Sequence, residues 1–174
     1  MRQIILIIHN VRSAHNVGAL LRTADGLGVE KVIISGYSPY PPAKDDVRLP
    51  HIAQKAGRAI QKTALGAEAS VNWQKVDDIS IYLDKLTADN WAIAALEQTE
   101  SAKALSGYRP PNKIALIVGN EVGGLEDELL AKLPIHLEIP MMGAKESLNV
   151  AAAGAIGLYH LRYSPFKGLD KQST

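Results

Sequence analysis

Five short runs of almost wholly apolar residues recur along this chain, and they restrict its fold more than any other feature. They occupy residues 3–9, 31–35, 91–97, 113–119 and 135–139, and are rich in Ile, Val, Leu and Ala. Strands in which polar and apolar residues do not alternate are buried on both faces, as in parallel sheets covered by helices. The sequence therefore predicts an α/β fold with a parallel sheet and helices on both faces.

The segments between these runs are helical in pattern, and they cover residues 16–27, 50–65, 77–88, 125–133 and 147–163. One long irregular connection, "GYSPYPPAKDD" at residues 36–46, interrupts the alternation, and loops of this length in compact domains are often functional. No repeat or Gly/Ser-rich linker divides the chain. Its 174 residues can bury one substantial core, so we expect a single domain over residues 1–174.

Composition excludes several classes of protein. The chain has no cysteine, which rules out a disulfide framework, Cys-ligated zinc and a thiol nucleophile. Its five histidines lack the spacing of metal ligands, so no metal is expected. No apolar stretch approaches the ~20 residues that span a bilayer, and we expect a cytoplasmic protein. The net charge is only +1, so binding to a nucleic acid would require a local basic patch.

Polar or Gly-rich loops follow four of the predicted strands, at the edge where parallel sheets bind ligands. None of these loops has the phosphate-binding Gly-Lys-Ser/Thr motif, and "GNEVGG" is not a dinucleotide fingerprint. ATP and NAD are therefore disfavoured. The predicted last helix contains "VAAAGAIG", whose small side chains would admit a flat group such as an adenine. This pattern indicates a cofactor pocket without phosphate recognition.

Three segments carry a more specific signal: "NVRSAHNVGALLRTADGLG" (10–28), "IALIVGNEVGGL" (114–125) and "IPMMGAKESLNVAAAGAIG" (139–157). In order and spacing they resemble the three signature motifs of the SpoU/TrmH class of SPOUT RNA 2′-O-ribose methyltransferases. The matching positions are Asn16, Gly18, Arg22, Thr23 and Ala24; Gly119, Glu121, Gly124 and Leu125; and Ile139, Pro140, Met141, Gly143, Ser147, Leu148, Asn149 and Val150.

The resemblance implies both a fold and an activity. Proteins of this class thread the C-terminal segment through a loop to form a deep trefoil knot, an exception to the rule that chains do not knot. They transfer a methyl group from S-adenosylmethionine to a ribose 2′-hydroxyl of tRNA or rRNA. A homodimer is also implied, and "LYHLRYSPF" at residues 158–166 could supply its apolar contact. The small residues of the last helix would permit the close backbone crossings of a knot.

The resemblance also assigns roles to individual residues. The cofactor would lie against Leu96, Gly119, Ile139, Met141, Ser147 and Leu148. The family is often described with the arginine at the position of Arg22 activating the ribose hydroxyl directly. Because an arginine stays protonated in proteins, we expect Arg22 to stabilise the attacking ribose oxygen instead and to orient the adjacent phosphate. Asn16, Glu121 and Asn149 would hold the guanidinium and the ribose in place.

Each of these residues also has a purely structural interpretation. Arg22 projects from the side of its helix opposite the apolar stripe, so by itself it would be a solvated surface residue. Ser147 could cap the last helix as well as touch the cofactor, and Asn16 could cap the first. Glu121 could cap the turn that follows it, and Asn149, placed one turn into its helix, could simply face water.

A basic strip is predicted on the second helix, where Lys55, Arg58 and Lys62 recur at helical spacing after Lys44, Arg48 and His51. The strip would bind RNA, or it is an ordinary solvated face. Two other functions stay open: a catalytically silent RNA-binding relative, and a small nucleotide-binding protein of flavodoxin-like type. The joint presence of Arg22, Glu121 and Asn149 favours the methyltransferase.

Overall fold

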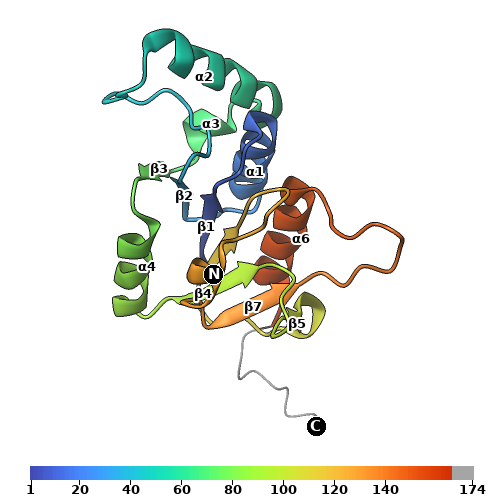
Figure 1. Cartoon of the computed structure of the whole chain (residues 1–174). Coiled ribbons are helices and arrows are strands. Elements are labelled where there is room, and N and C mark those ends of the chain that lie inside the picture. Colours follow the sequence, from blue (N-terminus) through green and yellow to red (C-terminus); the bar gives the residue numbers. More distant parts are fainter. Residues whose placement is uncertain (166–174) are drawn as a thin grey trace.

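One seven-stranded sheet organises the computed structural model, which describes residues 1–165 (Figure 1). The strand order is β3-β2-β1-β6-β4-β7-β5, and every pair is parallel. The strands are β1 (Gln3–His9), β2 (Lys31–Ser35), β3 (Trp73–Val76), β4 (Ala92–Leu96), β5 (Lys103–Ala104), β6 (Lys113–Val118) and β7 (Ile135–Glu138). The five predicted strands are all present, and the parallel sheet is confirmed.

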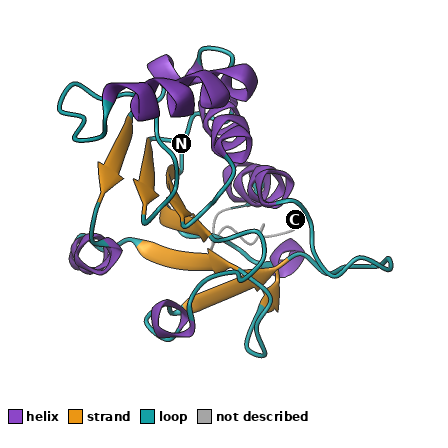
Figure 2. Ribbon diagram, turned by 45° about the horizontal axis from the view of Figure 1, so that its top comes forward, coloured by secondary structure: helices purple, strands orange, loops and turns teal. Residues whose placement is uncertain are grey.

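Helices cover both faces of this sheet (Figure 2). They are α1 (Ala14–Gly26), α2 (Pro50–Ala64), α3 (Ala67–Ser70), α4 (Ile79–Ala88), α5 (Asp127–Leu130) and α6 (Val150–Tyr163), with a 3-10 turn at Leu105–Gly107. Along β1, Ile4, Leu6 and Ile8 pack in one core with α1, α2 and α6, whereas Ile5 and Ile7 pack in a second core with α4 and α5. The predicted two-sided cover is confirmed. Within residues 1–165 no helix is long and apolar enough to cross a bilayer.

Two strands were not predicted, because neither is a buried apolar run. Every residue of β3 is at least partly exposed, and β5 consists of two exposed residues beside β7. Helix boundaries also differ. The helix predicted over residues 125–133 is only the single turn of α5, and the last helix begins at Val150 instead of residue 147. Edge strands and helix ends depend on tertiary contacts, which apolar periodicity does not record.

Small residues in α6 let the helix lie close to its neighbours. A Cβ atom at Gly154 would lie 2.5 Å from Cδ2 of Leu20 in α1, and one at Gly157 would lie 2.9 Å from Cδ2 of Leu116 in β6. Larger side chains would push α6 away from α1 at Gly154 and away from the sheet at Gly157. The Ala- and Gly-rich sequence of α6 thus serves its packing against α1 and the central strands.

Gly18 permits an equally close contact between α1 and α2. A Cβ atom there would lie 2.2 Å from Oγ1 of Thr63 and 2.3 Å from the carbonyl oxygen of Ile60. Because a helix backbone cannot retreat without opening the interface, Gly18→Ala should lower the free energy of unfolding by about 1–3 kcal/mol. Urea unfolding followed by circular dichroism measures this. Gly26→Ala is the control in the same helix, since nothing lies within 4 Å of its new Cβ; equal losses in both variants would contradict the prediction.

Candidate active site

A pocket opens at the carboxyl ends of β4, β6 and β7, beside the start of α6. All six residues predicted to touch a cofactor line it: Leu96, Gly119, Ile139, Met141, Ser147 and Leu148. They come from three segments that are distant in sequence, at the ends of β4, β6 and β7, and the parallel sheet brings these segments to one edge. The loop between β7 and α6, which carries four of the six, extends away from the body of the protein (Figure 1).

The loop after β6 forms one wall of the pocket and is tightly folded. The backbones of Asn120 and Gly124 exchange two hydrogen bonds of 3.1 Å, and the Asn120 side chain accepts from the backbone N–H groups of Val122 and Gly123. Gly119 has no room for a side chain, because a Cβ atom would lie 2.8 Å from Leu125 and 2.9 Å from the backbone carbon of Gly124. This wall is therefore rigid and close to any bound group.

The charge around the pocket is negative. Glu97, Glu121 and Glu138 line it, and none of the described residues that line it is Lys or Arg. Such a pocket favours a ligand that carries positive charge and disfavours polyphosphates. S-adenosylmethionine carries a sulfonium and an ammonium group, so the lining fits this group better than it fits ATP or NAD. Among residues 1–165, no cluster of side chains suited to a metal ion occurs.

Three of the four predicted catalytic residues form one hydrogen-bonded chain beside the pocket. The Nδ2 of Asn149 donates to Oδ1 of Asn16 over 3.1 Å, and the Nδ2 of Asn16 donates to Oε1 of Glu121 over 2.8 Å. The orientation of the Asn149 amide is fixed because its Oδ1 accepts from the N–H groups of Ala151 and Ala152. Each asparagine has a second N–H, which remains available to a substrate oxygen.

Glu121 anchors this chain to the first turn of α1. Its carboxylate accepts from the backbone N–H groups of Arg12 (3.0 Å) and Ser13 (3.2 Å) as well as from Asn16. Burial alone would raise the pKa of the Glu121 carboxyl, but these hydrogen bonds outweigh burial and hold the pKa below its usual value. Glu121 is therefore ionised at neutral pH, and it fixes Asn16 in one orientation.

The lowered pKa of Glu121 predicts a pH-dependent contribution to stability. A depressed folded-state pKa gives stabilisation that is complete above the unfolded pKa, about 4.3, and is lost as the pH falls through the folded value. The free-energy difference between wild type and Glu121→Gln should thus be largest near neutral pH and shrink below about pH 4. Urea unfolding at several pH values measures it. Glu100→Gln, at an exposed position, is the control; a Glu121 difference that stays constant with pH would disprove the prediction.

Arg22 does not belong to this chain. It lies six residues beyond Asn16 on the exposed side of α1, and within residues 1–165 its guanidinium has no hydrogen bond or ion pair. Six residues advance a helix by about 9 Å and turn it to another face. The structure therefore brings Asn16, Glu121 and Asn149 together, while Arg22 faces outward from the same helix.

Two predicted helix caps were placed on the wrong residues. Ser13, not Asn16, caps α1, and its side chain accepts from the N–H of Asn16. Asn149, not Ser147, caps α6, so Asn149 is not one turn inside the helix. Both errors come from placing helix starts two or three residues away from their true positions, where several cap-forming residues stand close together.

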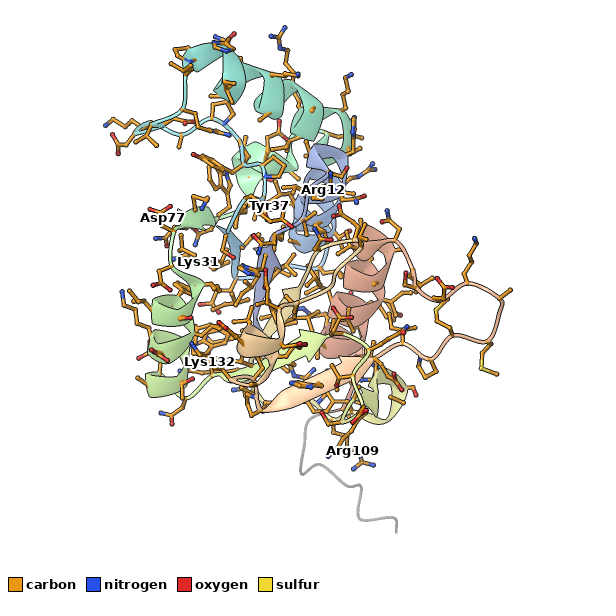
Figure 3. The ribbon with its side chains drawn as sticks, viewed as in Figure 1. Arg12, Lys31, Tyr37, Asp77, Arg109 and Lys132 are labelled. Atoms are coloured by element: carbon orange, nitrogen blue, oxygen red, sulfur yellow. The ribbon has the colours of Figure 1, made fainter. Side chains whose placement is uncertain are left out.

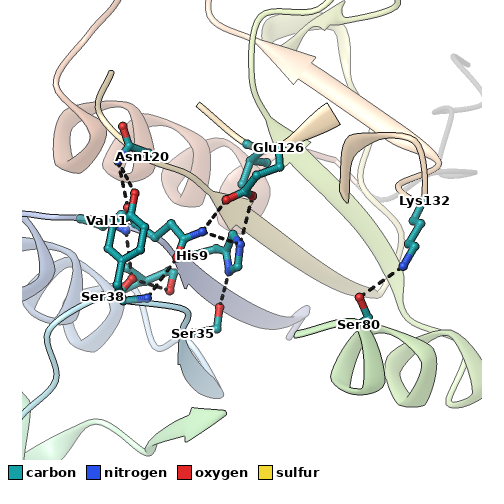
Figure 4. A network of polar contacts seen from close by, with 12 residues as sticks. His9, Val11, Ser35, Ser38, Ser80, Asn120, Glu126 and Lys132 are labelled. Atoms are coloured by element: carbon teal, nitrogen blue, oxygen red, sulfur yellow. Dashed lines mark hydrogen bonds and ion pairs between the residues drawn. The ribbon is translucent and has the colours of Figure 1, made fainter. Parts of the chain in front are cut away.

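A second polar network surrounds the end of β1, and no motif predicted it (Figure 4). His9, buried at the end of β1, contacts Oγ of Ser35 (2.8 Å) and Oε2 of Glu126 (3.2 Å), and Asn10 donates to both His9 and Glu126. Burial lowers the pKa of His9 more than Glu126 raises it, so the imidazole is neutral at pH 7. A His-Asn pair directly after an apolar strand is the signal that could have revealed this network.

The predicted basic strip is exposed on the outer side of α2, with Lys55, Arg58 and Lys62 all open to solvent. Arg48, predicted to extend the strip, is instead held within its own loop. It forms an ion pair with Asp46 and lies over the Tyr40 ring, 3.4 Å from the ring centroid. The hydrogen bonds from Arg48 to the Asp46 side chain hold the pKa of that carboxyl well below its usual range. The strip therefore depends on α2 itself.

Comparison with known proteins agrees with this geometry. The chain is 31% identical over 158 residues to the 23S rRNA (guanosine(2553)-2'-O)-methyltransferase RlmP of Bacillus subtilis, covering 91% of this chain and 57% of that protein. The AdoMet-bound rRNA methyltransferase from Sinorhizobium meliloti has the same fold, with a TM-score of 0.76, 21% identity, and coverage of 93% of this chain and 57% of that one. This chain thus spans little more than half the length of these relatives.

A second solved structure is similar to this chain in length as well as in fold. This structure is described as giving structural insights into the 2-OH methylation of C/U34 on tRNA. Its TM-score is 0.67 at 24% sequence identity, and the match covers 92% of this chain and 94% of that chain. The family described as the SpoU rRNA Methylase family matches residues 3–159, nearly the whole described structure and all three motifs. With the α/β sheet and the convergence of the motif residues at one edge, this match shows that the chain belongs to the SpoU rRNA methylase family.

Proposed function

We propose that this protein transfers a methyl group from S-adenosylmethionine to a ribose 2′-hydroxyl of tRNA or rRNA. The observation that carries the proposal is the placement of the Asn149–Asn16–Glu121 chain beside a carboxylate-lined pocket. Family membership supports it, as do relatives whose names describe rRNA and tRNA methylation. Bound in the pocket, S-adenosylmethionine supplies an activated methyl group, so the protein must mainly align the acceptor hydroxyl and stabilise its developing charge.

The residues divide this work between them. Glu121 fixes the amide of Asn16, and Asn16 fixes that of Asn149, so two N–H donors are oriented before the ribose arrives. Arg22 then stabilises the attacking oxygen and orients the neighbouring phosphate. Because Arg22 faces outward, away from the pocket of its own chain, we propose that it acts on the pocket of a second copy.

The second copy would pack on an apolar groove along α6. The groove is lined by Leu105, Ile139, Pro140, Ile156, Tyr159 and Tyr163, and the last three of these expose much of their surface to solvent. Ile139 lines both the groove and the cofactor pocket, so a partner seated here would lie next to the active site. Phe166, part of the apolar segment predicted for this contact, lies outside the described residues. Light scattering at micromolar concentration tests the dimer, and a stable monomer would refute it.

The knot expected from the resemblance is also part of the proposal. Its support is the side-chain amide of Gln98, which donates to the carbonyl of Glu146 and so ties the loop after β4 to the loop before α6. The close seating of α6 at Gly154 and Gly157 is consistent with threading of the C-terminal segment.

RNA would reach the site along the basic strip on α2. If Lys55, Arg58 and Lys62 contact phosphates, changing all three to Glu should weaken RNA binding and flatten its salt dependence, while S-adenosylmethionine affinity stays the same. Filter binding at several salt concentrations measures the RNA affinity and its salt dependence. An RNA affinity equal to that of the wild type would show that the basic strip on α2 is an ordinary solvated face.

Two measurements test the central proposal. Calorimetry with S-adenosylmethionine separates it from a flavodoxin-like nucleotide-binding protein, and no binding at millimolar cofactor would refute it. Tritium transfer from labelled S-adenosylmethionine to RNA isolated from a strain that lacks the gene separates it from a silent RNA-binding relative. Position-by-position mapping of ribose methylation in that strain identifies the acceptor nucleotide.

A further inference from the structure

Tyr37 is an exposed aromatic residue at the carboxyl edge of the sheet. It stands two residues beyond β2, and its side chain is 60% exposed. The Pro-rich loop that begins beside it leads directly to α2 and its basic strip. Figure 3 shows Tyr37 and Arg12 between α2 and the body of the sheet. Neither residue has a role in the mechanism proposed above.

The exposed ring is nevertheless held in a fixed position. Its phenol oxygen accepts from the side chain of Asn120 over 2.6 Å, and its backbone N–H donates to Oδ1 of Asn10 over 3.0 Å. Asn10 is itself buried and bonded to Glu126. The hydroxyl of the next residue, Ser38, accepts from the N–H of Val11 (Figure 4) and donates to the carbonyl of Ile8. A ring restrained in this way loses little conformational entropy when a ligand covers it.

The same contacts connect Tyr37 to the active site. Asn120, which holds the phenol, also lines the cofactor pocket and directly precedes Glu121. Arg12 is exposed, and while its backbone N–H binds Glu121, its guanidinium has no hydrogen bond or ion pair within residues 1–165. A fixed aromatic face and an uncommitted cation therefore flank the site on the side from which the basic strip approaches.

We propose that Tyr37 stacks on a base of the bound RNA strand next to the ribose that is methylated, and that Arg12 binds a phosphate of the same strand. Proteins recognise single-stranded RNA by stacking unpaired bases on aromatic rings and by pairing arginines with phosphates. Such a contact would place the acceptor ribose against the Asn149–Asn16–Glu121 chain. This inference rests on the proposed function and adds to it a preference for an unpaired acceptor region.

Binding of a fluorescein-labelled ten-nucleotide oligoadenylate, measured by anisotropy with S-adenosylmethionine present, tests the stacking contact. Tyr37→Ala should weaken this binding by on the order of 10-fold. The affinity of Tyr37→Ala for a labelled ten-residue ribose-phosphate strand without bases should equal that of the wild type. That strand has no base that could stack on the Tyr37 ring. Tyr37→Phe keeps the ring and should bind the oligoadenylate nearly as well as the wild type, whereas Tyr37→Leu should resemble alanine.

Arg12→Gln should have a different effect. It should weaken both strands alike and lower the slope of log affinity against log salt by about one, the effect of one lost phosphate contact. Affinity for S-adenosylmethionine should be unchanged in all these variants, because Asn120 keeps its bonds to Asn10, Val122 and Gly123 when the phenol is removed.

Several results would overturn the inference: oligoadenylate binding that survives Tyr37→Ala, an equal loss for both strands in that variant, or no oligoadenylate binding by the wild type. Failure of the proposed function looks different. It would appear as wild-type protein that does not bind S-adenosylmethionine or does not methylate RNA, whatever the Tyr37 variants do.

Discussion

Replacing Arg22 by alanine should lower methyl-transfer turnover by on the order of 100-fold or more, while affinity for S-adenosylmethionine barely changes. The guanidinium would act on charge that develops in the transition state, so its loss should appear in turnover and not in cofactor binding. As a solvated residue outside the apolar stripe of α1, Arg22 contributes little to folding, and the free energy of unfolding should change by no more than about 0.5 kcal/mol.

The assay is tritium transfer from labelled S-adenosylmethionine to the identified RNA, with calorimetric cofactor binding on the same variants. Arg22→Lys keeps the charge but lacks the planar fork, so it should be nearly as inactive as alanine if orientation of the ribose and phosphate is essential. Lys31→Ala, at the far end of β2 from the site, is a control that should keep full turnover. Full activity of Arg22→Ala would overturn the catalytic role.

Substitution of Gly119 should have the opposite effect and weaken cofactor binding. A Cβ atom at this position meets the Leu125 side chain and the Gly124 backbone within 3.0 Å, so Gly119→Ala must displace the loop that walls the pocket. Strain of about 1–3 kcal/mol corresponds to an affinity for S-adenosylmethionine lowered by about 5- to 150-fold. Calorimetry measures this, with thermal unfolding to verify that the variant is folded.

Gly123→Ala is the matched control on the same loop. The nearest atom to its new Cβ lies 3.9 Å away, so cofactor affinity should stay at the wild-type value. A folded Gly119→Ala variant that binds S-adenosylmethionine normally would show that the loop tolerates the displacement.

Together the two impaired variants, assayed at a cofactor concentration too low to saturate Gly119→Ala, test whether Arg22 acts across a dimer. Arg22→Ala protomers keep an intact pocket, and Gly119→Ala protomers keep Arg22. If each arginine serves the pocket of its partner, co-expression should restore a measurable fraction of activity through mixed dimers, because one of their two sites is complete. If the arginine serves its own pocket, the mixture should stay as inactive as its components.

Prediction from sequence succeeded where one physical effect dominates. Runs such as residues 113–119 are apolar on both faces and have few alternatives to a central parallel strand. Prediction failed where local choices are nearly equal in energy. Around the start of α6, Ser147 and Asn149 are both good caps, and only packing of Val150 into the core decides between them. The two exposed residues of β5 carry no strand signal at all.

The candidate site shows the same division. The three motifs located Asn16, Glu121 and Asn149, and the structure joins them by hydrogen bonds that no spacing rule could give. Tyr37 was missed because one tyrosine in a Pro-rich loop carries no signal until its phenol is seen bonded to Asn120. The outward direction of Arg22 became informative only once its own chain was found to offer it no partner among residues 1–165.

The cap of α6 limits which substitutions position 149 can accept during evolution. Asn149 uses its oxygen to start the helix and its nitrogen to hold Asn16, and a primary amide is the group that offers both at that reach. Aspartate could start the helix but would place a second negative charge beside Glu121, and alanine could do neither. Most changes at this position would therefore damage folding and chemistry in a single step, so neutral drift there should be slower than at Ser147, only two residues away.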